Sequence, residues 1–230
     1  MDARNMSAQR PGVLCLQGGR ELTAPCTEMD RAVLDRCDGP VVVLAGAARP
    51  GSDYAGASAR TVAYYRTLDA EVIPVPDPRD DPSRALDALH DDIGLIVMPG
   101  GSPGGLLDVL TEIDGGSIGH RLIELWRGGS GISGASAGAM VMCSRTATPS
   151  RSGDDGPGLG LVPGMAIPHW SPGSERRWVL TASPLWGLPE CGGVIIDDGR
   201  VAAVGQGEPS VQIENVWHPV TRSGTDPMPA

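Results

Sequence analysis

Residues 131–142 read GISGASAGAMVM, two apolar runs that meet at a single serine, Ser136. The first run is typical of a buried β-strand and the second of the start of a helix. The residues on either side of the serine are all glycine or alanine, as a sharp strand-to-helix turn requires when it presents a hydroxyl to a substrate. The same pattern fits a serine that caps a helix packed closely on a strand. The stretch therefore predicts a strand–turn–helix unit and leaves two interpretations of Ser136 open.

Short β-branched runs alternate with longer amphipathic segments through the first part of the chain. The predicted buried strands are 12–17, 41–47, 70–75, 93–99 and 131–135. The predicted helices are 27–37, 54–68, 82–91 and 117–129, with Thr27 and Asp30 resembling a helix N-cap. Strands that alternate with helices indicate an α/β fold, a doubly wound and mostly parallel sheet with helices on both faces.

Beyond Ser136 the composition changes. The segment 150–160, SRSGDDGPGLG, is rich in turn-forming residues and is predicted to be a flexible loop. The dipeptide Asp198–Gly199 joins two apolar runs within 192–207, which predicts a C-terminal β-hairpin, and residues 210–216 favour one more strand. For 230 residues we expect one catalytic α/β domain over 11–217, between a disordered N-terminus (1–10) and a disordered tail (218–230).

The charge and composition argue against several classes of partner. A net charge of −10 disfavours nucleic acid and an anionic membrane surface, both of which select basic patches. All 18 basic residues are arginine, so a P-loop with its lysine is excluded. The polar N-terminus and the absence of a long apolar run favour a cytoplasmic location.

The cysteines are five in number and scattered, without a C-x-x-C pair. This spacing predicts neither a zinc site nor a disulfide framework, and no metal or organic cofactor is expected. Cys143 lies about two helical turns beyond Ser136 and is expected inside the packing as a small hydrophobic residue.

A second glycine-rich stretch, MPGGSPGGLLDVL (98–110), also follows a predicted strand. Its glycines allow backbone N–H groups to point outward. An oxyanion hole usually combines the N–H of the residue after the nucleophile with one from a neighbouring loop, which makes Ala137 and Gly101 the candidates. An ordinary glycine-rich turn between a strand and a helix is the alternative.

A serine nucleophile needs a base, and His169 is the best placed of the four histidines. Pro168 and Trp170 flank it at the end of an apolar segment, which restricts the backbone and lets aromatic packing hold the imidazole. A satisfied core histidine is the alternative. The other three lie in predicted helices or near the polar tail: His90, His120 and His218.

Two places in the sequence could supply the carboxylate that orients this imidazole. Glu190 stands among apolar and small residues just before a predicted strand, and a carboxylate in such surroundings usually has a partner. Asp154 and Asp155 lie in the predicted loop between Ser136 and His169, where an exposed charged pair is the ordinary explanation.

Taken together, these motifs resemble the peptidase E (aspartyl dipeptidase) and cyanophycinase family of serine peptidases, which has the class I glutamine amidotransferase-like fold. The family's G-x-S-A-G-A elbow stands here as GASAGA (134–139), and its Gly-Gly loop before a helix as GGSPGGLL (100–107). Its proline–histidine–aromatic element stands as PHW (168–170), after GLGLVPG (158–164), and its later element as GLPE (187–190). The motifs follow the family's order over about residues 12–207.

The resemblance implies that Ser136 is the nucleophile, His169 the general base, and Gly101 and Ala137 the oxyanion donors. It leaves the acid open, with Glu190 as first choice and Asp154 or Asp155 as the second. It also implies that Gly100 and Ser102 contact the substrate, although Ser102 stands where the family often has asparagine. The region between His169 and Glu190 is shorter than in peptidase E. Within it, Arg176 and Arg177 either receive a substrate carboxylate or are surface charges.

The function that the resemblance implies is hydrolysis of a dipeptide or short peptide, N-terminal aspartyl peptides included, through an acyl-serine intermediate. A serine-dependent amide or ester hydrolase, or an acyltransferase, acting on a small metabolite is the first alternative. A catalytically silent binding protein on the same fold is the second. The expected partner is a small substrate, not nucleic acid or a membrane, and a homodimer is left open.

Overall fold

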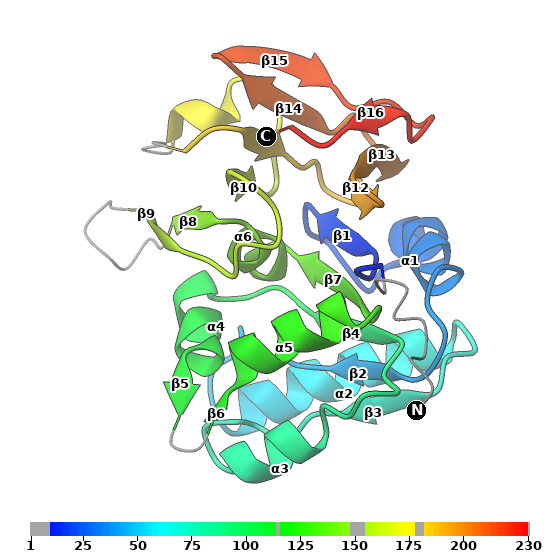
Figure 1. Ribbon diagram of the computed structural model, residues 1–230, viewed down its shortest axis with the longest axis vertical. Helices are drawn as coiled ribbons and strands as arrows, with labels where there is room; N and C mark the ends of the chain where they lie inside the picture. Colours follow the sequence, from blue (N-terminus) through cyan, green and yellow to red (C-terminus); the bar gives the residue numbers. More distant parts are fainter. Residues whose placement is uncertain (1–9, 114–115, 148–154, 178–181, 230) are drawn as a thin grey trace, which may run out of the picture.

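The fold is built around one large central sheet. The computed structural model describes residues 10–113, 116–147, 155–177 and 182–229. Within these residues the sheet has eight strands in the order β16-β13-β12-β1-β7-β4-β2-β3 (Figure 1). Five neighbouring strands run parallel: β1 (Leu14–Gln17), β7 (Gly131–Ala135), β4 (Leu95–Met98), β2 (Val41–Val43) and β3 (Val72–Pro74). The strands beyond β1 are antiparallel: β12 (Gly192–Asp197), β13 (Arg200–Gly205) and β16 (Asp226–Pro227). The predicted mostly parallel sheet is confirmed.

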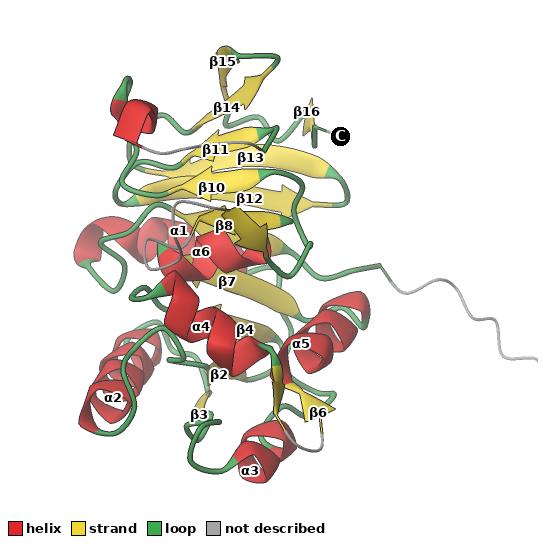
Figure 2. Ribbon diagram, turned by 90° about the vertical axis from the view of Figure 1, so that its left-hand side faces the viewer, coloured by secondary structure: helices red, strands yellow, loops and turns green. Residues whose placement is uncertain are grey.

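Helices cover both faces of this sheet, and the strands divide their side chains between the two. On one face Cys15 of β1 packs in a cluster with α1 (Thr27–Leu34) and α2 (Ser52–Arg66). On the other, Leu14 and Leu16 pack in the cluster that contains the remaining helices: α3 (Pro82–Asp87), α4 (Pro103–Leu110), α5 (Ile118–Arg127) and α6 (Ala137–Met142). In Figure 2 the parallel strands lie between α2 on the left and α5 on the right. Burial on both faces explains why these strands are continuous apolar runs.

A smaller sheet is built from strands that precede and follow the β12–β13 hairpin in the sequence. Its order is β10-β11-β14-β15, from β10 (Met165–Ile167), β11 (Leu185–Gly187), β14 (Ser210–Ile213) and β15 (Val216–Pro219). The remaining elements are short: η1 (Ala24–Cys26), β5 (Glu112–Ile113), β6 (Gly116–Ser117), β8 (Arg145–Ala147), β9 (Asp155–Pro157) and η2 (Ser174–Arg177). The end of β10 leads directly into the segment that contains His169.

The hairpin predicted at Asp198–Gly199 joins β12 to β13, and both turn residues have positive φ, 49° and 70°. This is the conformation that a tight two-residue hairpin turn requires. The loop predicted over 150–160 is only partly described, and its end differs from the prediction, because Asp155–Pro157 pairs with β8 as β9.

The predicted disordered tail also differs from the structure, in which residues 218–229 are placed. β15 extends to Pro219, and Asp226 pairs with Val201 on the edge of the large sheet. The reason is a polar turn, in which the Asp226 carboxylate accepts hydrogen bonds from the backbone N–H and the hydroxyl of Thr221 at 2.9 and 2.8 Å. Val220 is buried, which anchors the same segment.

The sequence predicted that Asp30 takes part in a helix N-cap, but in the structure it is a buried carboxylate. Helix α1 begins at Thr27 without a side-chain cap, and Asp30 is only 2% exposed. Its oxygens accept hydrogen bonds from Gln17 Nε2 (2.7 Å), Tyr64 Oη (2.7 Å) and Tyr65 Oη (3.1 Å). Sequence pattern could not show this, because the donors come from β1 and α2.

Burial raises the pKa of the Asp30 carboxyl above its ordinary 3.8, although its three donors act in the opposite direction. A carboxyl whose pKa is higher in the folded than in the unfolded state makes folding less favourable as pH rises through that window. The free energy of unfolding of the wild type, minus that of Asp30→Asn, is therefore expected to fall as pH rises from below 3.8 to above the raised pKa. Urea denaturation over a pH series measures this difference. Asp35→Asn, at an exposed position at the end of α1, is the matched control, and a difference for Asp30→Asn that stays constant with pH would contradict the expectation.

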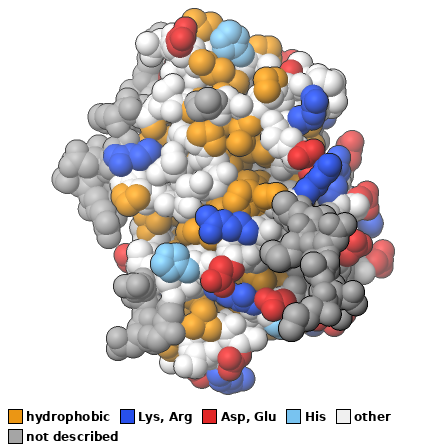
Figure 3. All heavy atoms as spheres, in the orientation of Figure 1, with side chains coloured by type: hydrophobic (Ala, Val, Ile, Leu, Met, Phe, Trp, Pro, Cys, Tyr) orange, Lys and Arg blue, Asp and Glu red, His pale blue; other side chains and the backbone are white. Residues whose placement is uncertain are grey.

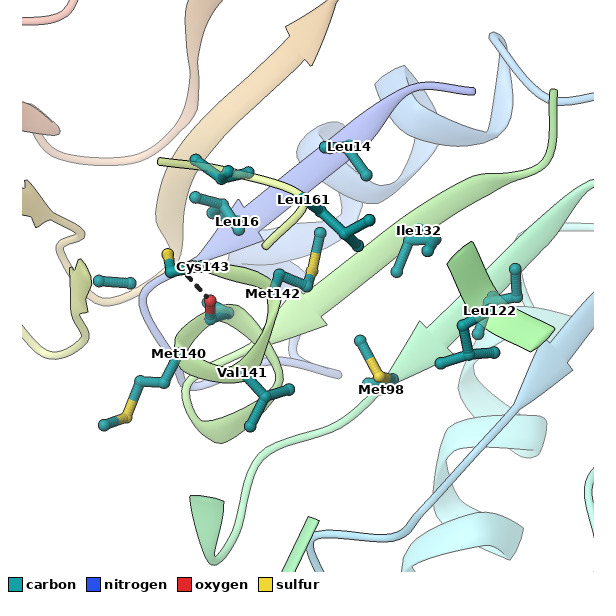
Figure 4. Packing of buried hydrophobic residues seen from close by; sticks show 14 of the residues in the cluster. Leu14, Leu16, Met98, Leu122, Ile132, Met140, Val141, Met142, Cys143 and Leu161 are labelled. Carbon is teal, nitrogen blue, oxygen red and sulfur yellow. Dashed lines mark hydrogen bonds between the residues drawn. The ribbon is translucent and has the colours of Figure 1, made fainter. Parts of the chain in front are cut away.

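Helix α6 lies wholly inside the molecule, and all of its residues are buried. Cys143, which follows it, is fully buried, and its thiol donates to the carbonyl of Ala139 at 3.6 Å. Figure 4 shows it among Leu16, Met140 and Met142. Burial raises the pKa of the Cys143 thiol to about 12. The expectation that Cys143 packs as a small hydrophobic residue is confirmed.

The surface turned toward the viewer in Figure 3 carries arginine side chains singly, among acidic, apolar and neutral groups. In the part of the chain that the structure describes, no helix combines the length and the apolar character needed to cross a bilayer.

Candidate active site

Ser136 stands at a strained turn between β7 and α6. Its backbone has φ 48° and ψ −105°, a conformation that non-glycine residues rarely adopt and that recurs at functional sites. The turn is held by a hydrogen bond from its N–H to the carbonyl of Gln17 on the neighbouring strand (2.9 Å). A side-chain carbon on Gly134 would lie 2.5 Å from the backbone of Gly138, and one on Gly138 would lie 2.3 Å from the carbonyl oxygen of Met98. Gly134 and Gly138 are therefore required by the close packing of strand and helix.

His169 reaches the same place from the end of β10. Its Nε2 lies 3.4 Å from Ser136 Oγ, and its backbone also has positive φ, 52°. The N–H of His169 donates to the carbonyl of Gly18 at 2.8 Å, which fastens this segment to the loop after β1. The side chain is 51% exposed, so one side of the imidazole remains open to solvent.

Glu190 completes a line of three side chains. Its Oε1 lies 3.2 Å from His169 Nδ1, on the opposite side of the ring from Ser136. The adjacent Cys191 has φ 55°, and its N–H donates to the carbonyl of Gly19 at 3.0 Å. Of the two acid positions that the sequence left open, the structure thus brings Glu190 beside the imidazole. Asp154 lies outside the described residues, and Asp155 is placed only by its backbone in β9.

The loop after β1, residues 18–21, contacts the segments that carry His169 and Glu190, and the sequence analysis missed it. Besides the bonds of Gly18 and Gly19, Arg20 Nη1 lies 3.5 Å from Glu190 Oε2, and the Glu21 carboxylate accepts the N–H of Gly100 at 2.8 Å. A side-chain carbon on Gly19 would lie 2.4 Å from Cε1 of His169. The available signal was a Gly-Gly pair at the carboxyl end of a predicted strand, the edge at which α/β sheets hold their ligands.

The Gly-rich loop between β4 and α4 lies against the serine. A side-chain carbon on Gly100 would lie 3.2 Å from Ser136 Cβ, and Gly101 has φ 149°. Within the described chain, no protein group accepts the N–H of Gly101 or of Ala137. Gly101 is exposed, whereas Ala137 is buried under the turn. The N–H of Gly100 is already held by Glu21, and the hydroxyl of Ser102 accepts the N–H of Gly105 (3.1 Å) as the cap of α4.

Two open hollows adjoin this loop, of about 590 Å³ and about 520 Å³. Both are lined by Ala57, Arg60 and Gly100, so the two hollows adjoin each other at these residues. The arginines that the sequence analysis considered for a substrate carboxylate, Arg176 and Arg177, fall in η2, and their side chains lie outside the described residues. Among the residues that are described, no three His, Cys, Asp or Glu side chains gather as a metal site.

A serine on a strained elbow, an imidazole and a carboxylate in line, beyond the carboxyl ends of a doubly wound sheet, define a serine hydrolase of the α/β class. The model of Peptidase family S51, the peptidase E family, matches residues 27–210, and the chain belongs to this family of serine peptidases.

Solved structures agree with this fold. The crystal structure of a peptidase from an acI-B1 actinobacterium superposes with a TM-score of 0.77 at 20% identity, covering 94% of this chain and 96% of that one. A candidate peptidase E protein from Listeria monocytogenes EGD-e, solved at 1.5 Å, superposes with a TM-score of 0.64 at 15% identity, covering 86% of this chain and 100% of that one. No curated protein matches the sequence significantly. The predicted peptidase E-like fold is confirmed.

Proposed function

We propose that this serine peptidase hydrolyses dipeptides or short peptides, N-terminal aspartyl peptides among them, through an acyl-serine intermediate. The observation that carries the proposal is the position of His169, 3.4 Å from Ser136 Oγ on one side and 3.2 Å from Glu190 on the other. A distance of 3.4 Å between Ser136 Oγ and His169 Nε2 is long for a hydrogen bond, and hydrogen bonds between catalytic groups commonly shorten when substrate binds. We also propose a cytoplasmic location, and the five free cysteine thiols are consistent with its reducing conditions.

In the proposed reaction, His169 Nε2 takes the proton of Ser136 as Oγ attacks the peptide carbonyl carbon. The N–H groups of Gly101 and Ala137 hold the oxyanion that forms, and Glu190 stabilises the imidazolium. The tetrahedral intermediate then collapses, the C–N bond breaks, and His169 donates its proton to the leaving amine. Water, deprotonated by the same imidazole, releases the acyl group from Ser136.

One observation favours a second candidate, a serine-dependent hydrolase or acyltransferase that acts on a small metabolite. Ser102 occupies the position of the family's usual asparagine, and its hydroxyl caps α4. The side-chain amide that would orient a peptide is therefore missing at this position. A panel of dipeptides with free N-termini separates the candidates, because robust turnover of aspartyl dipeptides would exclude the metabolite alternative.

Labelling with a fluorophosphonate probe tests the serine chemistry without knowledge of the substrate. We expect labelling of the wild type, and its loss in Ser136→Ala and in His169→Ala, because the probe needs an activated hydroxyl. His218→Ala is the matched control, since it removes an exposed histidine on β15. Labelling that persists without Ser136 or His169 would contradict the proposed triad. A wild type that is never labelled would contradict the proposal and favour a silent binding protein.

A further inference from the structure

Glu21 is a carboxylate in the candidate active site that the proposed reaction does not use. Its Oε1 lies 2.8 Å from the position that a side-chain carbon on Gly100 would occupy, and Ser136 Cβ lies 3.2 Å from the same point. The carboxylate and the serine therefore both border Gly100. Glu21 also lines the larger of the two hollows.

The backbone holds Glu21 in this place with some strain. Arg20 and Leu22, on either side of it, have φ of 56° and 61°, in the left-handed region that non-glycine residues avoid. The carboxylate accepts one hydrogen bond, from the N–H of Gly100, which leaves most of its acceptor capacity free. Among the described residues it has no ion-pair partner, and the nearby Arg20 faces Glu190 instead.

A negative charge at this position opposes the proposed chemistry unless a cation joins it. The N–H of Gly101, which would hold the oxyanion, belongs to the residue after Gly100, whose own N–H donates to Glu21. The oxyanion and the Glu21 carboxylate would then be like charges in a partly buried site, where they repel. A substrate that brings a positive charge would remove this cost. The site therefore favours a substrate with a cationic group close to the carbonyl that Ser136 attacks.

Peptide geometry identifies this cation. The α-ammonium nitrogen of an N-terminal residue is two bonds, about 2.5 Å, from the carbonyl carbon of that residue. A carboxylate that accepts hydrogen bonds from this ammonium group must then lie near the nucleophile, and Glu21 borders the same glycine as Ser136. We propose that Glu21 binds the α-ammonium group of the substrate's N-terminal residue, so that Ser136 attacks the first peptide bond of the chain. This role rests on the proposed peptidase function.

The hollow leaves room for the rest of that residue. It extends from Glu21 past Thr61 and Tyr64 to Arg60, an exposed arginine of α2. The N-terminal side chain would enter this space, while the α-ammonium group stays at its inner end.

Glu21→Gln tests the proposal, because glutamine keeps an acceptor for the N–H of Gly100 and loses the charge. We expect kcat/KM for dipeptides with a free N-terminus to fall about 10- to 100-fold, the range for loss of a charge-assisted hydrogen bond. The rate of fluorophosphonate labelling, which involves no ammonium group, should stay the same or rise. Glu28→Gln, at an exposed position on α1, is the matched control and should change neither rate.

A protection experiment separates this proposal from the peptidase function itself. L-alaninamide and the α-amide of L-aspartic acid, each beside its N-acetyl form, are tested for protection of Ser136 against the probe. We expect protection by a free amine in the wild type, its loss in Glu21→Gln, and little protection by the N-acetyl forms. A wild type that shows this protection but hydrolyses no peptide would overturn the peptidase function alone. Equal protection by free and acetylated amides, or an equal fall of hydrolysis and labelling in Glu21→Gln, would overturn the role of Glu21.

Discussion

Replacing Ser136 by alanine is expected to lower kcat/KM for peptide hydrolysis by about 10⁴-fold or more, the scale of loss when the nucleophile of a serine triad is removed. The imidazole of His169 and the N–H groups of Gly101 and Ala137 would remain, but no covalent intermediate could form. Hydrolysis is followed by chromatography of the released amino acids, with the best dipeptide of the panel as substrate.

The same substitution should leave the fold intact. Alanine keeps the side-chain carbon that already tolerates φ 48° in this turn, so the backbone strain is nearly unchanged. The thermal unfolding midpoint is the check on this point. Ser171→Ala is the matched control for activity, since it removes an exposed hydroxyl soon after His169. Hydrolysis in Ser136→Ala at the wild-type rate would exclude the acyl-serine route.

The parts of this fold that the sequence predicts are those determined by local pattern. The strand 131–135 has the predicted bounds, and the turn at Asp198–Gly199 lies where predicted, because a continuous apolar run and a turn dipeptide have few other solutions. The elbow at Ser136 belongs with them. Its glycines are required because α6 packs directly on β7, the strand before it, and on the neighbouring strand β4.

The parts that the sequence could not predict depend on contacts between distant segments. Asp30 has the spacing of a helix cap, yet its burial is determined by tyrosines of α2. From the sequence, Glu190 is the first choice for the acid and Asp154 or Asp155 the second. The pairing of β11 with β10, two segments that lie apart in sequence, brings Glu190 to the imidazole. Likewise, β16 pairs with β13 at one edge of the large sheet, although it comes from a tail whose composition is typical of disorder.

Gly19→Ala is expected to lower kcat/KM by about 100-fold or more, because a small displacement of a catalytic group can cost that much. The added carbon would lie 2.4 Å from Cε1 of His169, a distance that no relaxed structure tolerates. The imidazole must then move, away from Ser136, from Glu190, or from both. The measurements are dipeptide kinetics and the rate of fluorophosphonate labelling, which should fall together.

Gly51→Ala separates this displacement from simple backbone strain. Gly51 also has positive φ, 74°, but a side-chain carbon there meets nothing within 4 Å. Both variants should lose stability, by about 1–3 kcal/mol for a non-glycine residue in an unfavourable backbone region, as measured by urea unfolding. Only Gly19→Ala should lose activity beyond what its stability explains. If the two variants were equally active, the imidazole would accommodate the methyl group, and the loop after β1 would not be what fixes the position of His169.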